Sequence, residues 1–296
     1  MLVPFDLADY TERAARLRVD DIDFDTFRAQ PLRDAELRCV AYMHDVEHHT
    51  ACYLRNLLNT RAHNDPEITD FLTIWNYEEH WHGDALGRVL AAHGAPHGRS
   101  RVARMRRRLG WKATASPLAW MAFSAATPQF LAVHMAFGVI NEWTTQAGYA
   151  RLSAIAGHPT LSELLRRIMR QEGRHIDFYL YKSRSLLNGS RAAPRTTRLV
   201  LRSLWDPVGA KVMPLEDTRH LVRTLFSGPD GRTTIQRIDR RIDRLPGLDG
   251  LELMAKAVTK YGAATGAGCE RADLRGDQYC VEQNPPDAFT QFRCTR

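Results

Sequence analysis

The sequence predicts an all-α protein built on a four-helix bundle, with extra short helices and a helical C-terminal extension. Four long segments repeat apolar residues at every third or fourth position, which is the period of an amphipathic helix. Runs of alternating β-branched residues, which would mark strands, are nearly absent. Of the 296 residues, 44% are hydrophobic and 25% are charged. This balance supports a large core and excludes a disordered chain, a collagen-like fibre and a disulfide-dense miniprotein.

Composition divides the chain into four predicted segments. They are an N-terminal lead-in with one short helix over residues 1–30, the bundle over 31–188, a basic helical extension over 189–262 and an irregular tail over 263–296. The tail holds three of the five cysteines, and no Cys-x-x-Cys pair supports a zinc ribbon. The first residues do not resemble a secretory signal. We therefore expect a cytoplasmic protein whose cysteines are free thiols.

The four long helices have recognisable ends. They are expected at residues 32–61, 66–93, 128–156 and 160–187. Asp65 followed by a proline is typical of a helix start. Gly157 is typical of a helix stop, and Thr160 with Glu163 is spaced as a capping box for the last helix. A shorter apolar helix is expected at 117–125.

Two Glu-x-x-His motifs place a carboxylate and an imidazole one helical turn apart. They are Glu79 with His82 and Glu172 with His175. Both pairs lie on the apolar stripes of their helices, and the two remaining long helices carry Glu47 and Glu142 in the middle of theirs. The stripe of the first helix runs through Leu37, Val40, His44, Glu47, Ala51, Leu54 and Leu58. The stripe of the second runs through Leu72, Trp75, Glu79, His82, Leu86 and Val89, that of the third through Leu131, Met135, Gly138, Glu142, Thr145, Tyr149 and Leu152, and that of the fourth through Leu161, Leu165, Ile168, Glu172, His175 and Tyr179.

Carboxylates that face a core are costly unless they are paired or bind a metal. Two divalent cations would supply four positive charges to four such carboxylates. One Glu from each of two helices and Glu-x-x-His from each of the other two is the ligand set of carboxylate di-iron bundles. The predicted metal ligands are therefore Glu47, Glu79, His82, Glu142, Glu172 and His175. The alternative is that these residues lie on solvated helix faces.

Three further residues are expected close to the ligands. Glu78 lies one position off its stripe, so it is either solvated or hydrogen-bonded to a ligand. Gln171 precedes a ligand and can reach His82. His44 shares the stripe of Glu47, and it is either a core histidine, a neighbour of the ligands or an extra ligand.

The motifs resemble those of the soluble acyl-carrier-protein desaturases. Residues 75–84 read W-N-Y-E-E-H-W-H-G-D and are similar to that family's E-E-N-R-H-G-D, while residues 171–175 read Q-E-G-R-H and are similar to its D-E-K-R-H. Residues 142–145 read E-W-T-T and are similar to E-R-A-T. The resemblance covers roughly residues 35–187, and it departs from the family at His80, Trp81 and Gln171.

This resemblance implies a ferritin-like, carboxylate-bridged di-iron oxidase or oxygenase. It implies two iron ions, O₂ as co-substrate, a ferredoxin-type electron donor and a homodimer. The substrate would be an acyl chain on acyl-carrier protein or coenzyme A, and the reaction a desaturation in which Thr145 manages protons or oxygen. The alternatives are a di-iron hydroxylase or N-oxygenase of a specialised biosynthetic pathway, and a non-enzymatic iron-binding protein of the same fold.

Seven basic residues follow the second long helix. They are Arg99, Arg101, Arg104, Arg106, Arg107, Arg108 and Lys112, in a chain of net charge +7. They indicate either a solvated face or a docking site for an acidic partner such as acyl-carrier protein, with Arg104, Arg106, Arg107 and Arg108 as the docking residues. No nucleic-acid recognition motif accompanies them. The longest apolar stretch, Pro117–Ile140, is interrupted by polar residues, so no membrane partner is expected.

Overall fold

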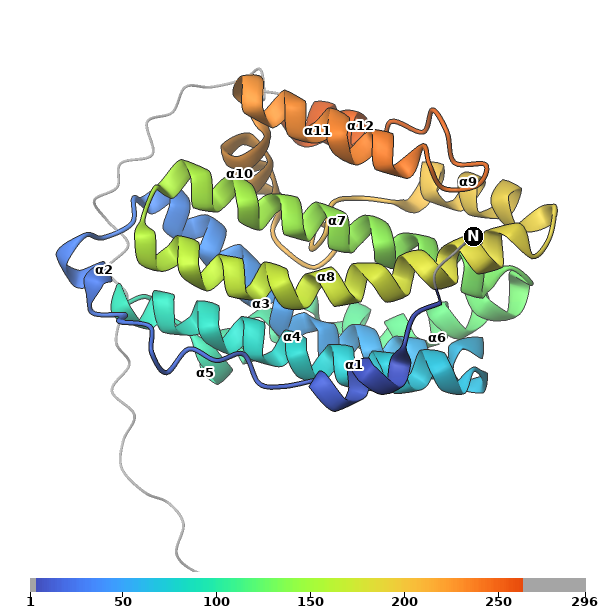
Figure 1. Ribbon diagram of the computed structural model, residues 1–296, viewed down its shortest axis with the longest axis horizontal. Helices are drawn as coiled ribbons and strands as arrows, with labels where there is room; N and C mark the ends of the chain where they lie inside the picture. The colour runs from blue at the N-terminus through green and yellow to red at the C-terminus, as the bar shows by residue number, and fades with distance from the viewer. Residues whose placement is uncertain (1–3, 263–296) are drawn as a thin grey trace, which may run out of the picture. The chain divides into compact units, whose positions relative to one another are not determined.

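The computed structural model describes residues 4–262, which belong to one structural unit. Every regular element in this range is a helix, so the predicted all-α class is confirmed. The bundle consists of α3 (Asp34–Leu58), α4 (Pro66–Ala92), α7 (Phe130–Ala156) and α8 (Pro159–Asn188) (Figure 1). The four observed ranges agree with the predicted ones to within three residues at each end. The predicted tail over residues 263–296 lies outside the described part of the chain.

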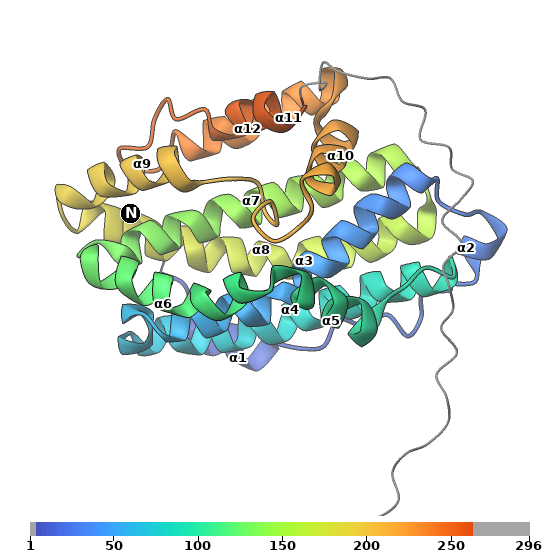
Figure 2. The ribbon, with the colours of Figure 1, turned by 180° about the vertical axis from the view of Figure 1, so that it is seen from behind.

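The bundle helices form two antiparallel pairs. The 3₁₀ turn η1 (Arg61–Asn64) joins α3 to α4, and a short turn joins α7 to α8. Between the pairs, α5 (Gly98–Leu109) and α6 (Trp111–Ala126) run back along the bundle beside α3, so that α4 and α7 point in the same direction (Figure 2). One long crossover of this kind is the connectivity of ferritin-like bundles.

The predicted start of α4 and the end of α7 are confirmed. The Asp65 carboxylate accepts a hydrogen bond from the Ile68 amide at 3.2 Å. Gly157 ends α7 with φ at 60°, in the left-handed region where a glycine has no steric penalty.

The predicted capping box of α8 is wrong. His158 is the N-cap, because Pro159 already occupies the first helical position. The Thr160 hydroxyl instead lies 2.8 Å from the hydroxyl of Thr26, and Glu163 binds the arginines of the next helical turn.

The crossover contains more helix than predicted. The apolar helix starts six residues earlier than expected, at Trp111, and runs through Pro117. A proline inside a helix leaves the carbonyl four residues before it without its amide partner. That carbonyl belongs to Ala113, and it accepts a hydrogen bond from Arg55 Nη2 at 3.0 Å. A side chain of α3 thereby stabilises the interrupted turn of α6.

The predicted stripe of α3 is wrong at its C-terminal end. Ala51 and Leu58 are exposed, whereas Leu57 is fully buried. The physical reason is α6, which packs along the last turns of α3 and binds Asn56 through Ser116 at 2.8 Å. This neighbour shifts the buried face of α3 by one residue.

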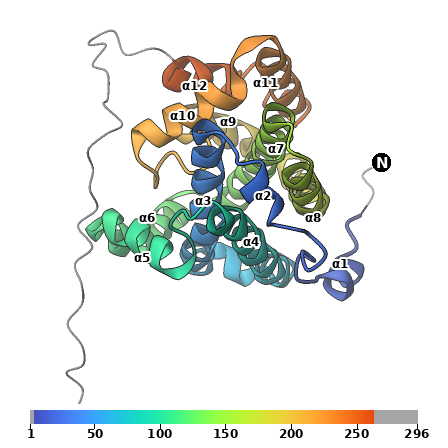
Figure 3. The same ribbon diagram turned by 90° about the vertical axis from the view of Figure 1, so that its left-hand side faces the viewer.

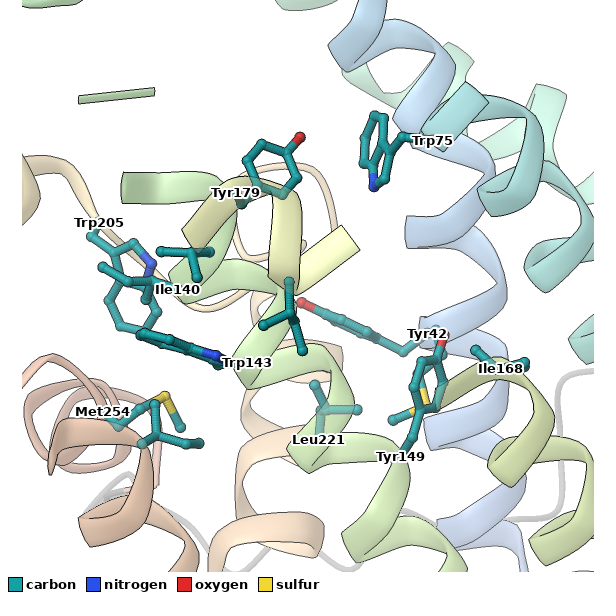
Figure 4. Close-up of a cluster of buried hydrophobic side chains, with 14 of the residues drawn as sticks. Tyr42, Trp75, Ile140, Trp143, Tyr149, Ile168, Tyr179, Trp205, Leu221 and Met254 are labelled. Atoms are coloured by element: carbon teal, nitrogen blue, oxygen red, sulfur yellow. The ribbon is translucent and has the colours of Figure 1, made fainter. Parts of the chain in front are cut away.

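The C-terminal extension packs on the bundle. It comprises α9 (Ala192–Leu204), α10 (Leu215–Phe226), α11 (Gly228–Ile242) and α12 (Leu253–Gly262). Figure 3 shows these helices gathered around α7, with α10 also against α3. Side chains from both parts share one core, where Trp143 and Ile140 of the bundle lie beside Trp205 and Met254 of the extension (Figure 4).

Two short helices precede the bundle, where one was expected. They are α1 (Leu7–Arg13) and α2 (Thr26–Ala29). Tyr10 of α1 is buried against α4 and α8. Among the described residues, no helix is both long and apolar enough to cross a membrane.

Candidate metal centre

The structure brings the six predicted ligands together at the middle of the bundle, and all six are buried. Their ligand atoms form two overlapping groups, and within each group the atoms lie within 4.8 Å of one another. The first group is Glu47, Glu79, His82 and Glu172, and the second is Glu79, Glu142, Glu172 and His175. Each group can hold a metal ion.

The two groups share Glu79 and Glu172, which is the arrangement of bridging carboxylates. His82 Nδ1 lies 3.4 Å from Glu172 Oε1 and 3.6 Å from Glu79 Oε2. His175 Nδ1 lies 2.9 Å from the other oxygen of Glu172 and 3.3 Å from the other oxygen of Glu79. Each shared carboxylate therefore presents one oxygen to each histidine, and Glu47 and Glu142 complete the two groups from opposite sides.

Both histidines are oriented by a partner outside the cluster. His82 Nε2 is 2.9 Å from Gln171 Oε1, and His175 Nε2 is 2.9 Å from Glu78 Oε2. These contacts hold the Nε2 proton on the outer side, so Nδ1 faces the cluster and can bind a metal ion once it has lost its proton. Gln171 therefore reaches His82 as predicted, and of the two alternatives for Glu78 the structure shows the hydrogen bond to a ligand rather than a solvated side chain.

Glu78 is held by groups that the sequence did not indicate. Arg174 Nη2 donates to Glu78 Oε1 at 2.5 Å, and the Tyr10 hydroxyl donates to Glu78 Oε2 at 3.0 Å. Burial alone would raise the pKa of Glu78, but the hydrogen bond with His175 and the positive charge of Arg174 lower it. Glu78 is therefore a buried carboxylate that remains ionised. Arg174 is adjacent to a ligand in the chain, whereas nothing in the sequence around Tyr10 indicated a role.

The two outer carboxylates each accept a hydrogen bond from an aromatic side chain. Trp75 Nε1 donates to Glu142 Oε1 at 3.0 Å, and the Tyr149 hydroxyl donates to Glu47 Oε1. Both aromatic residues lie on the predicted stripes, where their apolar rings indicated only a place in the core. Figure 4 shows that Trp75 and Tyr149 come from different parts of the bundle.

Of the three alternatives for His44, the contacts of its ring support the core histidine rather than a neighbour of the ligands or an extra ligand. Its Nδ1 is 2.9 Å from Asp45 Oδ1, and its Nε2 accepts from the Gly98 amide at 3.2 Å. Its ring also packs against Gly87 of α4. Both ring nitrogens are therefore used at the junction of α3, α4 and α5, and His44 is a hydrogen-bonded core histidine.

The buried carboxylates and imidazoles of the cluster shift one another's pKa values. Burial and the neighbouring carboxylates raise the pKa of both Glu47 and Glu142. Although burial opposes it, the nearby carboxylates Glu172 and Glu79 raise the pKa of His82 to about 9, and the pKa of His175 is raised too. Four groups therefore retain protons that divalent cations would displace.

The donor set fits a pair of metal ions. His82 Nδ1 and Glu172 Oε1 are buried and have no hydrogen-bond partner in the described part of the chain. Buried polar atoms without partners are rare, and each needs an explanation such as a bound ion. Carboxylate oxygens with imidazole nitrogens suit iron, manganese or zinc.

Thr145 lies at a cavity beside the cluster. The cavity has a free volume of about 50 Å³, and its wall includes Glu47 and Thr145 from the bundle and Leu221 and Met254 from the extension. Most of this wall is apolar. The extension therefore covers an apolar space that borders one of the outer carboxylates.

The basic residues of α5 divide into two sets. Arg101 binds the buried Asp45 through two hydrogen bonds of 2.7 and 2.8 Å, and Arg106 donates to the carbonyl of His48. These two side chains hold α5 against α3. A second set is exposed and has no ion pair within residues 4–262: Arg99, Arg104, Arg107 and Arg108.

Comparison of the chain with protein-family models, with curated protein sequences and with solved structures finds no match in any of the three.

Proposed function

We propose that this protein is an O₂-dependent di-iron oxidoreductase that oxidises an apolar group. The observation that carries the proposal is the pair of shared carboxylates, Glu79 and Glu172, between two inward-facing imidazoles. The residues of the motifs favour an acyl chain on acyl-carrier protein or coenzyme A as substrate, desaturation as reaction and a ferredoxin-type electron donor. Bound iron would supply the activation of O₂ and the redox equivalents.

The protein's own residues orient the metal ligands and exclude water from the site. Gln171 and Glu78 hold the imidazoles through Nε2, while Tyr149 and Trp75 hold the outer carboxylates. Preorganised ligands of this kind keep their geometry when the charge of the centre changes. Burial of the cluster keeps bulk water away from the oxidation site.

Thr145 is proposed to hold a proton at the cavity wall. Its side chain borders the same cavity as Glu47. A hydroxyl there can donate a hydrogen bond or pass a proton to a reacting oxygen, whereas the rest of the wall is mostly apolar.

The cavity sets a condition on the substrate. A free volume of about 50 Å³ has room for about one or two water-sized groups. An acyl chain is larger, so desaturation requires that α10 or α12 move away from α7. A compact substrate needs a smaller movement, and this observation favours a hydroxylase or N-oxygenase of a specialised pathway as the second candidate.

The first experiment is metal analysis after anaerobic loading with Fe(II). We expect about two irons per chain, the number this ligand set holds in di-iron bundles. Glu142→Ala should lower the iron content sharply, whereas Glu163→Ala, which removes a half-buried carboxylate paired with Arg166 and Arg167, should not.

Exposure of the loaded protein to O₂, a reductant and acyl or amine substrates, followed by mass spectrometry, then identifies the product. If the wild-type protein binds no metal under these conditions, the proposal is refuted. One that stores iron without oxidising any substrate is the non-enzymatic alternative.

A further inference from the structure

A chain of aromatic side chains leads from the candidate metal centre to α6. Trp75, which donates to Glu142, has its ring centroid 6.1 Å from that of Tyr53. The Tyr53 ring lies 5.5 Å from the ring of Trp120 on α6. Trp75 is buried and Trp120 is half-exposed, so neighbouring rings connect a ligand of the centre to the surface. Figure 2 shows α6 beside α3 on the outside of the bundle.

Tyr53 has a buried proton acceptor. Its hydroxyl lies 3.0 Å from His134 Nδ1, and His134 is almost fully buried. Burial lowers the pKa of His134 to about 3, so its ring is neutral at pH 7. Burial also raises the pKa of the Tyr53 hydroxyl, which is therefore protonated. We assign the shared proton to the tyrosine and the lone pair to Nδ1.

His134 makes no other side-chain hydrogen bond within residues 4–262. Its Nε2 is buried and lacks a hydrogen-bond partner, and its ring lies against Phe130 at 6.1 Å. An imidazole without a second partner is an unusual choice for a core position, because an apolar residue would avoid the unpaired nitrogen. The contact with Tyr53 is the one interaction that uses its basicity.

An oxidised tyrosine needs such an acceptor. Loss of one electron turns the phenol into a very strong acid, so a neutral imidazole accepts its proton even when the pKa of that imidazole is low. Tyr53 loses one electron and one proton, the proton moves to His134 Nδ1, and a neutral tyrosyl radical remains. The electron passes through Trp75 toward Glu142.

We propose that Trp75, Tyr53 and His134 form a protective electron path that reduces the oxidised metal centre when no substrate is present. The proposal rests on the proposed function for its oxidant, which is the metal centre after reaction with O₂. Tryptophan and tyrosine give up electrons only to strong oxidants, so this path serves to quench the centre rather than to carry electrons from a ferredoxin-type donor. Trp120 then offers an exit for the oxidising equivalent at the surface.

Tyr179 provides a matched control. It is buried and lies 6.5 Å from Trp75, close to the distance between Trp75 and Tyr53. Its ring is also near His134, at 6.3 Å, but its hydroxyl makes no hydrogen bond to that histidine or to another described residue. Both tyrosines can be changed to phenylalanine with no change in ring shape.

The test generates an oxidant independently of iron. Full-length, metal-free protein is exposed to laser-generated ruthenium(III) tris-bipyridine, and radicals are followed by absorbance and by electron paramagnetic resonance. We expect a neutral tyrosyl radical in the wild type and in Tyr179→Phe. Tyr53→Phe should lose most of the signal, and the remainder should come from the exposed Tyr77. His134→Gln should slow radical formation by about 10²-fold, which is at the lower end of the effect of removing a positioned proton acceptor.

An undiminished signal in Tyr53→Phe, or a signal that falls as far in Tyr179→Phe, would overturn the proposal. Thermal unfolding of each variant establishes that it is folded before the comparison. A second measurement uses the iron-loaded protein with O₂ and no substrate, where Tyr53→Phe should lose iron-binding capacity faster over repeated cycles than Tyr179→Phe. If the chain binds no iron, the proposed function fails while the photochemical result still decides whether Tyr53 and His134 act as a pair.

Discussion

Metal removal combined with a rise in pH is the perturbation that tests the electrostatics of the candidate centre most directly. In the metal-free protein, four buried groups retain protons because their pKa values are raised. They are Glu47, Glu142, His82 and His175. Two divalent cations carry as much positive charge as four protons, so loading the centre should displace up to four protons. The metal-free and metal-loaded proteins should therefore respond to pH in opposite directions.

The sign follows from which state holds more protons. The folded, metal-free protein keeps protons on these groups at pH values where the unfolded chain has released them, so the free energy of unfolding falls as pH rises. For His82, the stabilisation is complete below the ordinary pKa of 6.5 and is lost as pH rises through about 9. That difference corresponds to about 3 kcal/mol from His82 alone. Glu47 and Glu142, whose pKa values are also raised, lower the free energy of unfolding in the same way as the pH rises above 4.5.

The assay is urea unfolding of chelator-treated protein at pH 6, 7.5 and 9, repeated after anaerobic loading with Fe(II) or Zn(II). We expect stability to fall with pH without metal and metal affinity to rise with pH. Glu142→Gln is the matched variant, because the amide resembles the protonated carboxyl. It should flatten the pH dependence of the metal-free protein and weaken metal binding. Metal binding that releases no protons, or metal-free stability that rises from pH 6 to 9, would refute the reasoning.

Three more outcomes are expected from side chains around the centre. Gly148→Ala should reduce substrate oxidation, since its methyl group would lie in ordinary contact with Met43 and Leu225 at the cavity. Gly173→Ala should leave substrate oxidation unchanged, because its methyl group would meet open space. Both changes should raise the free energy of unfolding in chemical denaturation by about 0.5–1 kcal/mol. Thr145→Val should keep its iron content but slow product formation by roughly 10²–10⁴-fold in single-turnover assays, and equal rates would assign Thr145 to packing. Replacing Arg107 and Arg108 with alanine should weaken the binding of an acidic carrier and flatten the salt dependence of that binding in titration calorimetry. Thermal stability should change little. Unchanged binding at low salt would indicate that these arginines belong to a solvated helix face without a docking role.

The bundle and its inward-facing acids could be predicted because both depend on local periodicity. A helix of 25 to 30 residues presents the same face at every third or fourth position, so its apolar stripe also indicates where a Glu on that stripe will point. All predicted stripe residues of α4 and α8 are buried, including Glu79 and Glu172. The start of α4 was equally local, because Asp65 needs only the amide of Ile68.

Other features depended on which element packs against which. Glu78 and His44 looked alike in the sequence, each close to a ligand, yet only Glu78 lies beside one. The difference comes from their neighbours: α1 and α8 bring Tyr10 and Arg174 to Glu78, whereas α5 brings a backbone amide to His44.

The assignment of partners within the centre was likewise a tertiary outcome. The Glu-x-x-His motifs set Glu79 and Glu172 apart from Glu47 and Glu142 in the sequence, but nothing local showed which of the four carboxylates would belong to both ligand groups. Glu79 and Glu172 are shared because their helices also carry the two histidines, and because α4 and α8 face each other across the bundle. Helical periodicity determines the direction in which a side chain points from the axis of its own helix. The atoms that the side chain contacts depend on the rotation and separation of the neighbouring helices, and packing over the whole core sets both.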